Sequence, residues 1–227
     1  MIGYKTIKKV ISDLEHYKLS GINKILFVGP EINFNYLYLK RLCHALIKRK
    51  LNLRWSSYAI PKKLDYALLN KMYKSGCRIL HFGVESGYQK RLDSLYKKTN
   101  VKEMESILSH CQQIGIRTHC LFIVGFPFET SKEFKKTVEF IVKNAYNIDF
   151  VDAIPFHAAY DSPLFNNPEK YNIKIIDKDA LVFRNYQYEE IGGKRYAEII
   201  KEQKKKRQII KEICKIWSKA LQPKRML

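Results

Sequence analysis

The feature that most restricts the fold of this chain is a regular alternation between short apolar runs and longer segments with helical periodicity. Apolar residues three or four positions apart predict amphipathic helices between the runs, and also before the first run, over residues 4–19. The apolar runs predict strands over residues 24–28, 53–59, 78–84, 118–124 and 150–156. Strands joined through helices form parallel sheets, because a parallel crossover needs a helix-length connection. The chain is therefore predicted to be an α/β protein.

Polar residues at the ends of the predicted helices support these boundaries. Asp65 can cap the helix after the second strand. Thr130 and Glu133 form a capping box at the start of the helix between the fourth and fifth strands. The helical region 88–114 is predicted to break near residues 98–100. The pattern opens with a helix, whereas a barrel repeat of this kind begins with a strand, so we expect a partial barrel that is missing its first strand.

The alternation ends after residue 155. Residues 157–190 are rich in Asn, Asp and Tyr and show little periodicity, and a long basic helix is predicted over residues 194–221. We therefore expect two parts: an α/β array over residues 1–165 and a C-terminal helical extension over residues 166–227.

The composition narrows the class of protein. A chain of 227 residues with 46% hydrophobic content is long enough for one sizeable domain with a buried core. The longest apolar run, Cys120 to Phe128, is too short to cross a bilayer, and the N-terminus shows no signal-peptide pattern. We expect a cytoplasmic protein without a membrane span.

The net charge of +20 is large enough to attract polyanions such as nucleic acid. Only 10 of the 42 basic residues are Arg, however, and closely read phosphates or bases usually involve Arg. We do not expect dedicated nucleic-acid binding, although it stays open as an alternative. The run Lys204-Lys205-Lys206-Arg207 is interpreted as a solvated helix face.

The cysteines do not form a metal-binding motif. No two of them stand in a Cys-x-x-Cys or Cys-x-x-x-Cys pair, which argues against a self-contained zinc or iron–sulfur site. We expect most of them to be buried thiols. The five are Cys43, Cys77, Cys111, Cys120 and Cys214.

One predicted strand delivers a carboxylate into a turn. Ile79 to Val84 is apolar apart from His81, and Glu85-Ser86-Gly87 follows it directly. In parallel barrels the functional residues lie at the carboxyl ends of strands, and glycine allows the backbone to approach a ligand closely. An ordinary turn with a solvated Glu is the simpler alternative for this segment alone.

Two further strand ends carry special residues, and together the motifs show a family likeness. In chain order they are Phe-Gly-Val-Glu-Ser-Gly-Tyr-Gln from residue 82, Val-Gly-Phe-Pro-Phe-Glu-Thr from residue 124, and Asp-Ser-Pro-Leu-Phe from residue 161. Over about residues 4–165 this order resembles the radical S-adenosylmethionine superfamily, and most of all the branch whose members often carry a cobalamin-binding domain in front of the barrel.

The resemblance implies an activity and its cofactors. Members of the family bind S-adenosylmethionine to a [4Fe–4S] cluster, pass one electron from a donor into the sulfonium, and form a 5′-deoxyadenosyl radical that abstracts a hydrogen atom. The barrel excludes water from that radical. The substrate differs between members, and the resemblance names none for this chain.

The resemblance also implies cofactor-binding residues. Glu85 matches a carboxylate that can accept hydrogen bonds from both ribose hydroxyls, and Ser86 and Gly87 match its turn. Lys97 matches a basic residue that can lie near the methionyl carboxylate, with a lysine on a helix surface as the alternative. The segment that faces the adenine is matched by Gly125 and Pro127.

The sequence departs from the family pattern at several positions, among them Asp161-Ser162-Pro163-Leu164, where relatives usually have Gly-Thr-Pro-Leu. The Cys-x-x-x-Cys-x-x-Cys loop that holds the cluster is expected just before residue 4 and is absent, so no metal ligand and no catalytic residue is assigned. Phe128 stands where relatives usually have Gly. Gly29 and Glu31 replace a more acidic turn and can still line the mouth of the site. Glu129 is favoured at a helix start by the helix dipole alone and is not assigned to the site.

Two hypotheses follow from these matches and departures. In the first, the chain is the barrel portion of a radical S-adenosylmethionine enzyme, is truncated at its N-terminus and is inactive alone; cobalamin would then require a separate upstream domain. In the second, the chain is a degenerate barrel that serves as a binding module, with RNA as a partner suggested by the basic charge.

Overall fold

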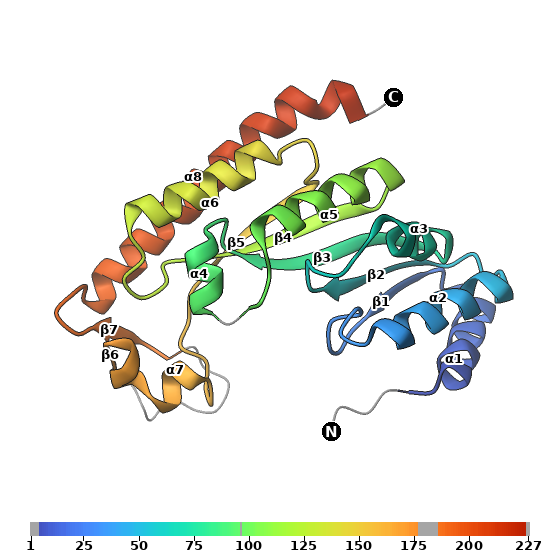
Figure 1. The fold of residues 1–227 in the computed structure, drawn as a ribbon, viewed down its shortest axis with the longest axis horizontal. Helices are drawn as coiled ribbons and strands as arrows, with labels where there is room; N and C mark the ends of the chain where they lie inside the picture. The colour runs from blue at the N-terminus through green and yellow to red at the C-terminus, as the bar shows by residue number, and fades with distance from the viewer. Residues whose placement is uncertain (1–4, 96, 177–185, 226–227) are drawn as a thin grey trace. The chain divides into compact units, whose positions relative to one another are not determined.

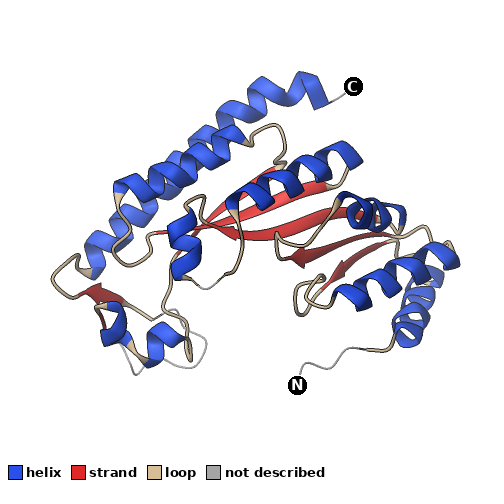
Figure 2. Ribbon diagram, viewed as in Figure 1, coloured by secondary structure: helices blue, strands red, loops and turns tan. Residues whose placement is uncertain are grey.

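The structure is a computed structural model that describes residues 5–95, 97–176 and 186–225. Within these residues five strands alternate with six helices in the order that the sequence predicts (Figures 1 and 2). The strands are β1 (Lys24–Phe27), β2 (Arg54–Ala59), β3 (Cys77–Glu85), β4 (Arg117–Val124) and β5 (Phe150–Pro155). The helices of this array are α1 (Ile7–Leu19), α2 (Tyr36–Arg49), α3 (Tyr66–Lys74), α4 (Gln89–Ser94), α5 (Val101–Ile114) and α6 (Ser131–Lys143).

The five strands form one sheet in chain order, β1-β2-β3-β4-β5. Strand β2 pairs in parallel with β1 and with β3, and one register shift lies between Trp55 and Ser56. A sheet whose spatial order equals its chain order, with a helix in every crossover, is the arrangement of a (β/α) barrel that has not closed. This confirms the predicted α/β class with a partial parallel barrel.

Local capping explains where the helices begin. The Asp65 carboxylate accepts the Leu68 amide at 2.7 Å at the start of α3. The predicted capping box is confirmed, because Thr130 N donates to Glu133 Oε2 at 2.8 Å and Glu133 N donates to Thr130 Oγ1 at 3.2 Å. The predicted break in the region 88–114 separates α4 from α5.

The chain divides into two compact units, and each draws on several stretches of sequence. The first unit comprises Met1–Val84, Leu92–Leu121 and Lys143–Val151. In it α1 packs on α2, α2 on α3, and α3 on α5, as the row of helices in Figure 1 shows. Its largest fully buried side chains include Trp55, Leu69, Met72 and Leu108.

The second unit comprises Glu85–Arg91, Phe122–Val142 and Asp152–Leu227. It holds most of α6, the helix α8 (Tyr196–Arg225) and a two-stranded antiparallel sheet of β6 (Ile173–Ile175) and β7 (Tyr188–Glu190). A short helix α7 (Pro163–Asn166) and a 3₁₀ turn (Pro168–Tyr171) precede this small sheet. Residues 157–176 and 186–190 are therefore more regular than their sequence suggests, because strands of three residues are too short to show periodicity.

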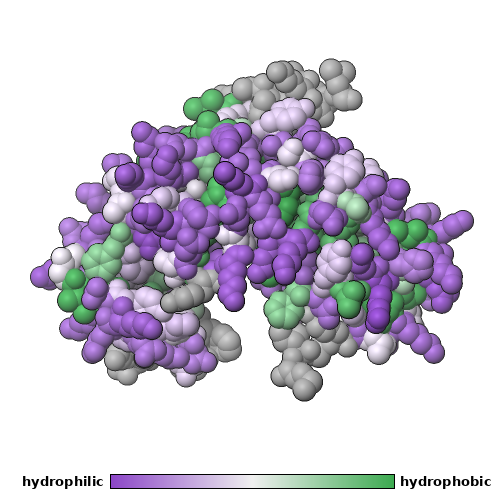
Figure 3. All heavy atoms as spheres, viewed as in Figure 1, coloured by the Kyte–Doolittle hydropathy of each residue, from purple (hydrophilic) through white to green (hydrophobic). Residues whose placement is uncertain are grey.

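The exposed surface is largely charged and polar, as the face in Figure 3 shows. In the part of the chain that the structure describes, every helix is too short or too polar to cross a membrane. The basic run on α8 is only partly a solvated face: Lys204, Lys205 and Arg207 are exposed, but Lys206 is 5% exposed. The interpretation of the whole run as solvated is therefore wrong for Lys206.

Candidate functional site

Strand β3 ends in a left-handed turn. Glu85 is its last residue and has φ +63°, a conformation that non-glycine residues adopt at a cost. The burial pattern alternates along the strand, so that Val84 is buried and Glu85 is half-buried. The carboxylate therefore stands at the carboxyl end of a parallel strand, where the sequence places it.

The two residues after Glu85 are fixed by α6. Ser86 Oγ lies 3.2 Å from Thr137 Oγ1, and Gly87 N donates to the same oxygen at 3.1 Å. A Cβ atom added to Gly87 would stand 2.5 Å from the Cβ of Phe140. Glycine is needed at this position because the backbone of the turn lies against a helix.

The segment after β4 turns at a second left-handed residue, Gly125, with φ +75°. Its N–H donates to Glu129 Oε2 at 2.8 Å, and its carbonyl accepts the Tyr188 hydroxyl at 3.1 Å and Gln203 Nε2 at 3.4 Å. A Cβ atom added to Gly125 would stand 2.3 Å from Gln203 Cγ. The N–H and the carbonyl of Gly125 are thus both hydrogen-bonded within the second unit. Pro127 is partly buried and, as a proline, has no backbone N–H that could donate to a ligand.

Phe128 stands where relatives usually have glycine, and its backbone conformation is one that favours glycine. Its φ is +56°, in the left-handed region that glycine adopts most readily. Its N–H donates to Glu190 Oε1 at 2.7 Å, while Glu190 Oε2 accepts Lys194 N at 3.1 Å. Glu190, which the sequence analysis missed, holds this strained residue in place.

Glu129 is one of the most buried carboxylates of the second unit, at 4% exposure. Besides the Gly125 amide it binds Lys206 Nζ at 2.7 Å, and Lys206 also pairs with Glu202, which in turn pairs with Lys194. Lys206 was not predicted as a buried residue because it lies in a basic run. The signal that could have found it is helical phase, since Lys206 lies seven residues after Ile199 and four before Ile210.

The structure does not group Lys97 with the other five predicted site residues. Glu85, Ser86, Gly87, Gly125 and Pro127 all belong to the second unit, whereas Lys97 belongs to the first. Lys97 is exposed in the loop between α4 and α5, and its N–H donates to Leu92 O at 3.3 Å. The alternative that placed it on a helix surface is wrong.

The thiols do not offer a metal centre. Four of the five cysteines are buried and Cys214 is partly so, and all five are free thiols. Burial raises the pKa of Cys43 to about 11 and that of Cys111 to about 12, which opposes formation of the thiolate that a metal needs. Among the described residues, which include every cysteine of the sequence, no three His, Cys, Asp or Glu side chains are placed to hold a metal ion.

A pair of histidines in the first unit was not predicted. His81 of β3 and His119 of β4 approach with their Nδ1 atoms 2.9 Å apart, so one ring donates and the other accepts. Burial, and then the charge of His119, lowers the pKa of His81. The Tyr58 ring lies 5.1 Å from that of His81 between centroids.

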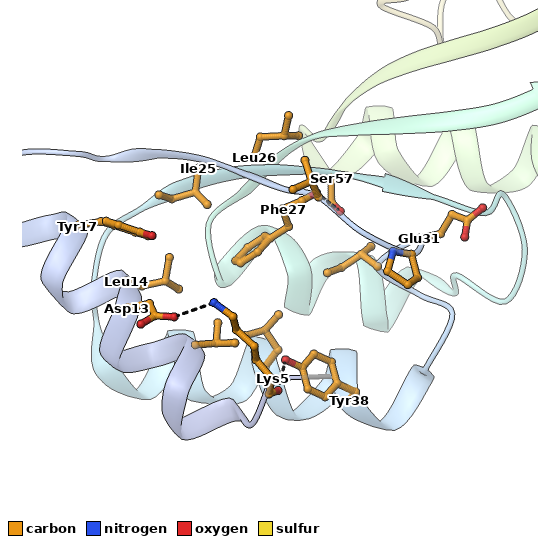
Figure 4. Close-up of a pocket in the computed structure, with 15 residues that line it drawn as sticks. Lys5, Asp13, Leu14, Tyr17, Ile25, Leu26, Phe27, Glu31, Tyr38 and Ser57 are labelled. Atoms are coloured by element: carbon orange, nitrogen blue, oxygen red, sulfur yellow. Dashed lines mark hydrogen bonds and ion pairs between the residues drawn. The ribbon is translucent and has the colours of Figure 1, made fainter. Parts of the chain in front are cut away.

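A cavity of about 420 Å³ lies in the first unit between α1, α2 and β1 (Figure 4). Apolar side chains such as Leu14 and Phe27 face its interior, and Lys5 Nζ binds Asp13 at 3.2 Å across it. Glu31, expected at the mouth of the site, lies at the rim with its carboxylate directed away from the other labelled side chains. The six predicted cofactor-binding residues are not among those that line this cavity.

Comparison with known proteins identifies a family. The family model described as the radical SAM superfamily matches residues 3–141, which is more than half of the chain. A bacteriochlorophyllide d C-12(1)-methyltransferase of Chlorobaculum tepidum is 26% identical over 203 residues, covering 86% of this chain and 43% of that protein. An uncharacterized methyltransferase of Pyrococcus horikoshii is 24% identical over 140 residues, covering 61% of this chain and 30% of that protein.

The fold also matches solved structures. The radical S-adenosylmethionine methyltransferase TsrM of Kitasatospora setae, with cobalamin and a [4Fe–4S] cluster bound, aligns with a TM-score of 0.69 at 17% identity. The alignment covers 78% of this chain and 38% of TsrM. The chain therefore spans less than half the length of these relatives, and at this identity the likeness shows the fold alone.

Proposed function

The chain belongs to the radical S-adenosylmethionine superfamily, and from this membership we propose that it binds S-adenosylmethionine for reductive cleavage to a 5′-deoxyadenosyl radical. The observation that carries the proposal is the pair of left-handed turns at Glu85 and Gly125, which stand at the ends of the neighbouring strands β3 and β4. Glycine adopts such a turn without strain, but Glu85 does not, and a strained non-glycine residue that the surrounding structure holds in place is typical of ligand sites.

Each residue has a proposed role that its chemistry supports. The half-buried Glu85 carboxylate accepts hydrogen bonds from the two ribose hydroxyls. Ser86 and Gly87 fix the direction of that carboxylate through their contacts with α6. Because the backbone groups of Gly125 are already bonded, we propose that Gly125 and Pro127 shape the surface on which the adenine packs. Lys97 stays a proposed partner of the methionyl carboxylate.

The iron–sulfur cluster does not fit the residues present. Three thiolates would be needed to leave one iron open to S-adenosylmethionine, and the described residues offer no such group. We propose that this chain supplies the nucleoside-binding half of the site, and that the cluster, its electron donor and any cobalamin are contributed by residues or domains outside it. No catalytic step is assigned to this chain alone.

A binding measurement tests the proposal without a cluster. S-adenosylhomocysteine carries the same adenosine, so isothermal titration of the purified chain should show saturable binding. Replacing Glu85 by Ala should weaken binding about tenfold, because a carboxylate that accepts two hydroxyl hydrogen bonds contributes roughly this much. Glu169→Ala is the matched control, since Glu169 is an exposed carboxylate of the 3₁₀ turn and has no proposed role in the site. Binding that is absent in the wild type, or equal in Glu85→Ala, would contradict the assignment.

A binding module for RNA is the second candidate, favoured by the net charge of +20. Among the relatives, a tRNA-2-methylthio-N(6)-dimethylallyladenosine synthase of Pelagibacter ubique is 28% identical over 160 residues. Electrostatic binding of RNA should weaken steeply between low and physiological salt. A gel-shift assay without a retarded band at low salt removes this candidate.

A further inference from the structure

The inward face of α8 carries polar residues in the middle of a buried stripe. Ile199, Gln203, Lys206 and Ile210 follow one another at helical spacing, and each is at most 5% exposed. A lysine is almost never buried to this degree unless it is paired, and an apolar residue would fill the same place at lower cost. Packing alone therefore does not explain why Gln203 and Lys206 occupy the middle of this stripe.

Lys206 meets its charge partners inside the second unit. Its Nζ binds Glu129 Oε2 at 2.7 Å, pairs with Glu202 one helical turn earlier, and lies 5.4 Å from the centroid of the Phe134 ring. The same oxygen of Glu129 accepts the Gly125 amide at 2.8 Å. One carboxylate oxygen thus joins the lysine of α8 to the backbone of the turn after β4.

Gln203 reaches the same turn from one helical turn earlier. Its Nε2 donates to Gly125 O at 3.4 Å and to Phe156 O at 3.0 Å, at the end of β5. The Tyr188 hydroxyl donates to Gly125 O as well, at 3.1 Å. Every polar backbone atom of Gly125 is therefore held, directly or through Glu129, by side chains from β7 and α8.

We propose that Lys206 and Gln203 of α8 are positioning residues for the S-adenosylmethionine site, because they set the conformation of the turn from Gly125 to Glu129. This inference rests on the proposed function, in which that turn faces the adenine. Residues 188–210 then form part of the cofactor-binding structure, and α8 does more than close the second unit. Neither residue is assigned a contact with the cofactor.

The test compares three substitutions on one helix. Lys206→Met removes the buried charge, Lys206→Arg conserves it, and Lys204→Met removes an exposed charge two residues away as the matched control. Binding of S-adenosylhomocysteine should weaken about tenfold or more in Lys206→Met, return most of the way in Lys206→Arg, and stay within about twofold of wild type in Lys204→Met.

Amide hydrogen exchange tests, without any ligand, whether Lys206 holds the turn in place. Exchange of the Gly125 amide should rise at least about tenfold in Lys206→Met while the amides of β6, in the same unit, keep their wild-type rates. A lysine that only stabilised the fold would change both sets together. Unchanged Gly125 exchange and unchanged affinity in a folded Lys206→Met would overturn the proposal.

A milder variant keeps the test decisive if Lys206→Met does not fold. Gln203→Leu removes only the hydrogen bonds to Gly125 O and Phe156 O, and it should raise Gly125 exchange and weaken binding about threefold. Wild-type exchange and affinity in this variant would also count against the proposal. If the wild-type chain fails to bind S-adenosylhomocysteine at all, the proposed function is wrong, whereas the exchange data still report on the contacts that Lys206 and Gln203 make with the turn from Gly125 to Glu129.

Discussion

The turn after β3 and the turn after β4 have similar backbone conformations, but different side chains hold them in place. Both end a parallel strand with a left-handed residue, and both depend on a glycine that a helix or its side chains crowd. The first turn is held by neutral hydroxyl groups, Ser86 and Thr137, whereas the second is held by the buried ions Glu129 and Lys206. Hydroxyl contacts cost little to lose, but a buried charge without its partner costs several kcal/mol. The second turn should therefore be the more sensitive of the two.

The largest effect is expected from Gly125→Ala. The new Cβ would meet Gln203 Cγ at 2.3 Å and would also sit at φ +75°, so overpacking and left-handed strain add up to about 3 kcal/mol of lost stability. Gly192→Ala is the control, because Gly192 has a similar φ of +70° with open space around it and should lose only about 1 kcal/mol. Equal losses in urea denaturation would show that crowding by α8 is not decisive.

Gly87→Ala should cost about 2 kcal/mol. Its Cβ would stand 2.5 Å from Phe140 Cβ and 2.9 Å from Lys136 O, so α6 must move outward. Urea denaturation measures the loss in the free energy of unfolding, which is compared with the loss in Gly125→Ala. A loss larger than that of Gly125→Ala would reverse the ranking of the two turns.

Glu85→Gly should separate stability from binding. Glycine relieves the strain at φ +63° but makes the unfolded chain more flexible, so the net gain in stability should be about 0.5 kcal/mol. Affinity for S-adenosylhomocysteine should fall in the same variant because the carboxylate is gone. Thermal unfolding and titration calorimetry on one preparation test both statements, and a destabilised variant would contradict the inferred strain.

Acid should loosen the surroundings of α8 and of α6 at different pH. Burial, and then Arg207 of α8, lowers the pKa of His157 from 6.5, so the unfolded chain binds the proton first and stability falls as pH drops below about 6.5. Burial opposes ionisation of Glu133, which caps α6, but hydrogen bonds with Thr130 and the charge of Arg91 together outweigh burial and lower the pKa of this carboxyl from 4.5. Its contribution is present above pH 4.5 and is lost below it.

Hydrogen exchange near pH 5.5 can therefore distinguish the regions. Amides of α8 should exchange faster than expected from their rates at pH 7.5, after correction for intrinsic exchange, while those of α6 should not. His157→Gln removes the titrating group and should cancel the difference. Equal loosening of α6 and α8 would show that the shift at His157 is not responsible.

The sequence predicts the first turn far better than the second. The order of strands and helices, the caps at Asp65 and Thr130, and the position of Glu85 all follow from local patterns, since periodicity and capping act over a few residues. The partners of Gly125 lie 63 and 78 residues away in Tyr188 and Gln203, within segments that show little periodicity or that look like a solvated basic helix. A pairing over such a distance leaves no local signal.

The burial of Glu129 also has a consequence for the order in which the protein is made. Lys206 is synthesised 77 residues after Glu129, so a nascent chain on the ribosome has the carboxylate long before its counter-ion. The first unit needs residues only up to Val151, whereas the second requires the C-terminal helix. Translation therefore favours completion of the first unit while the turn after β4 waits, and the last helix to emerge determines when that turn becomes native.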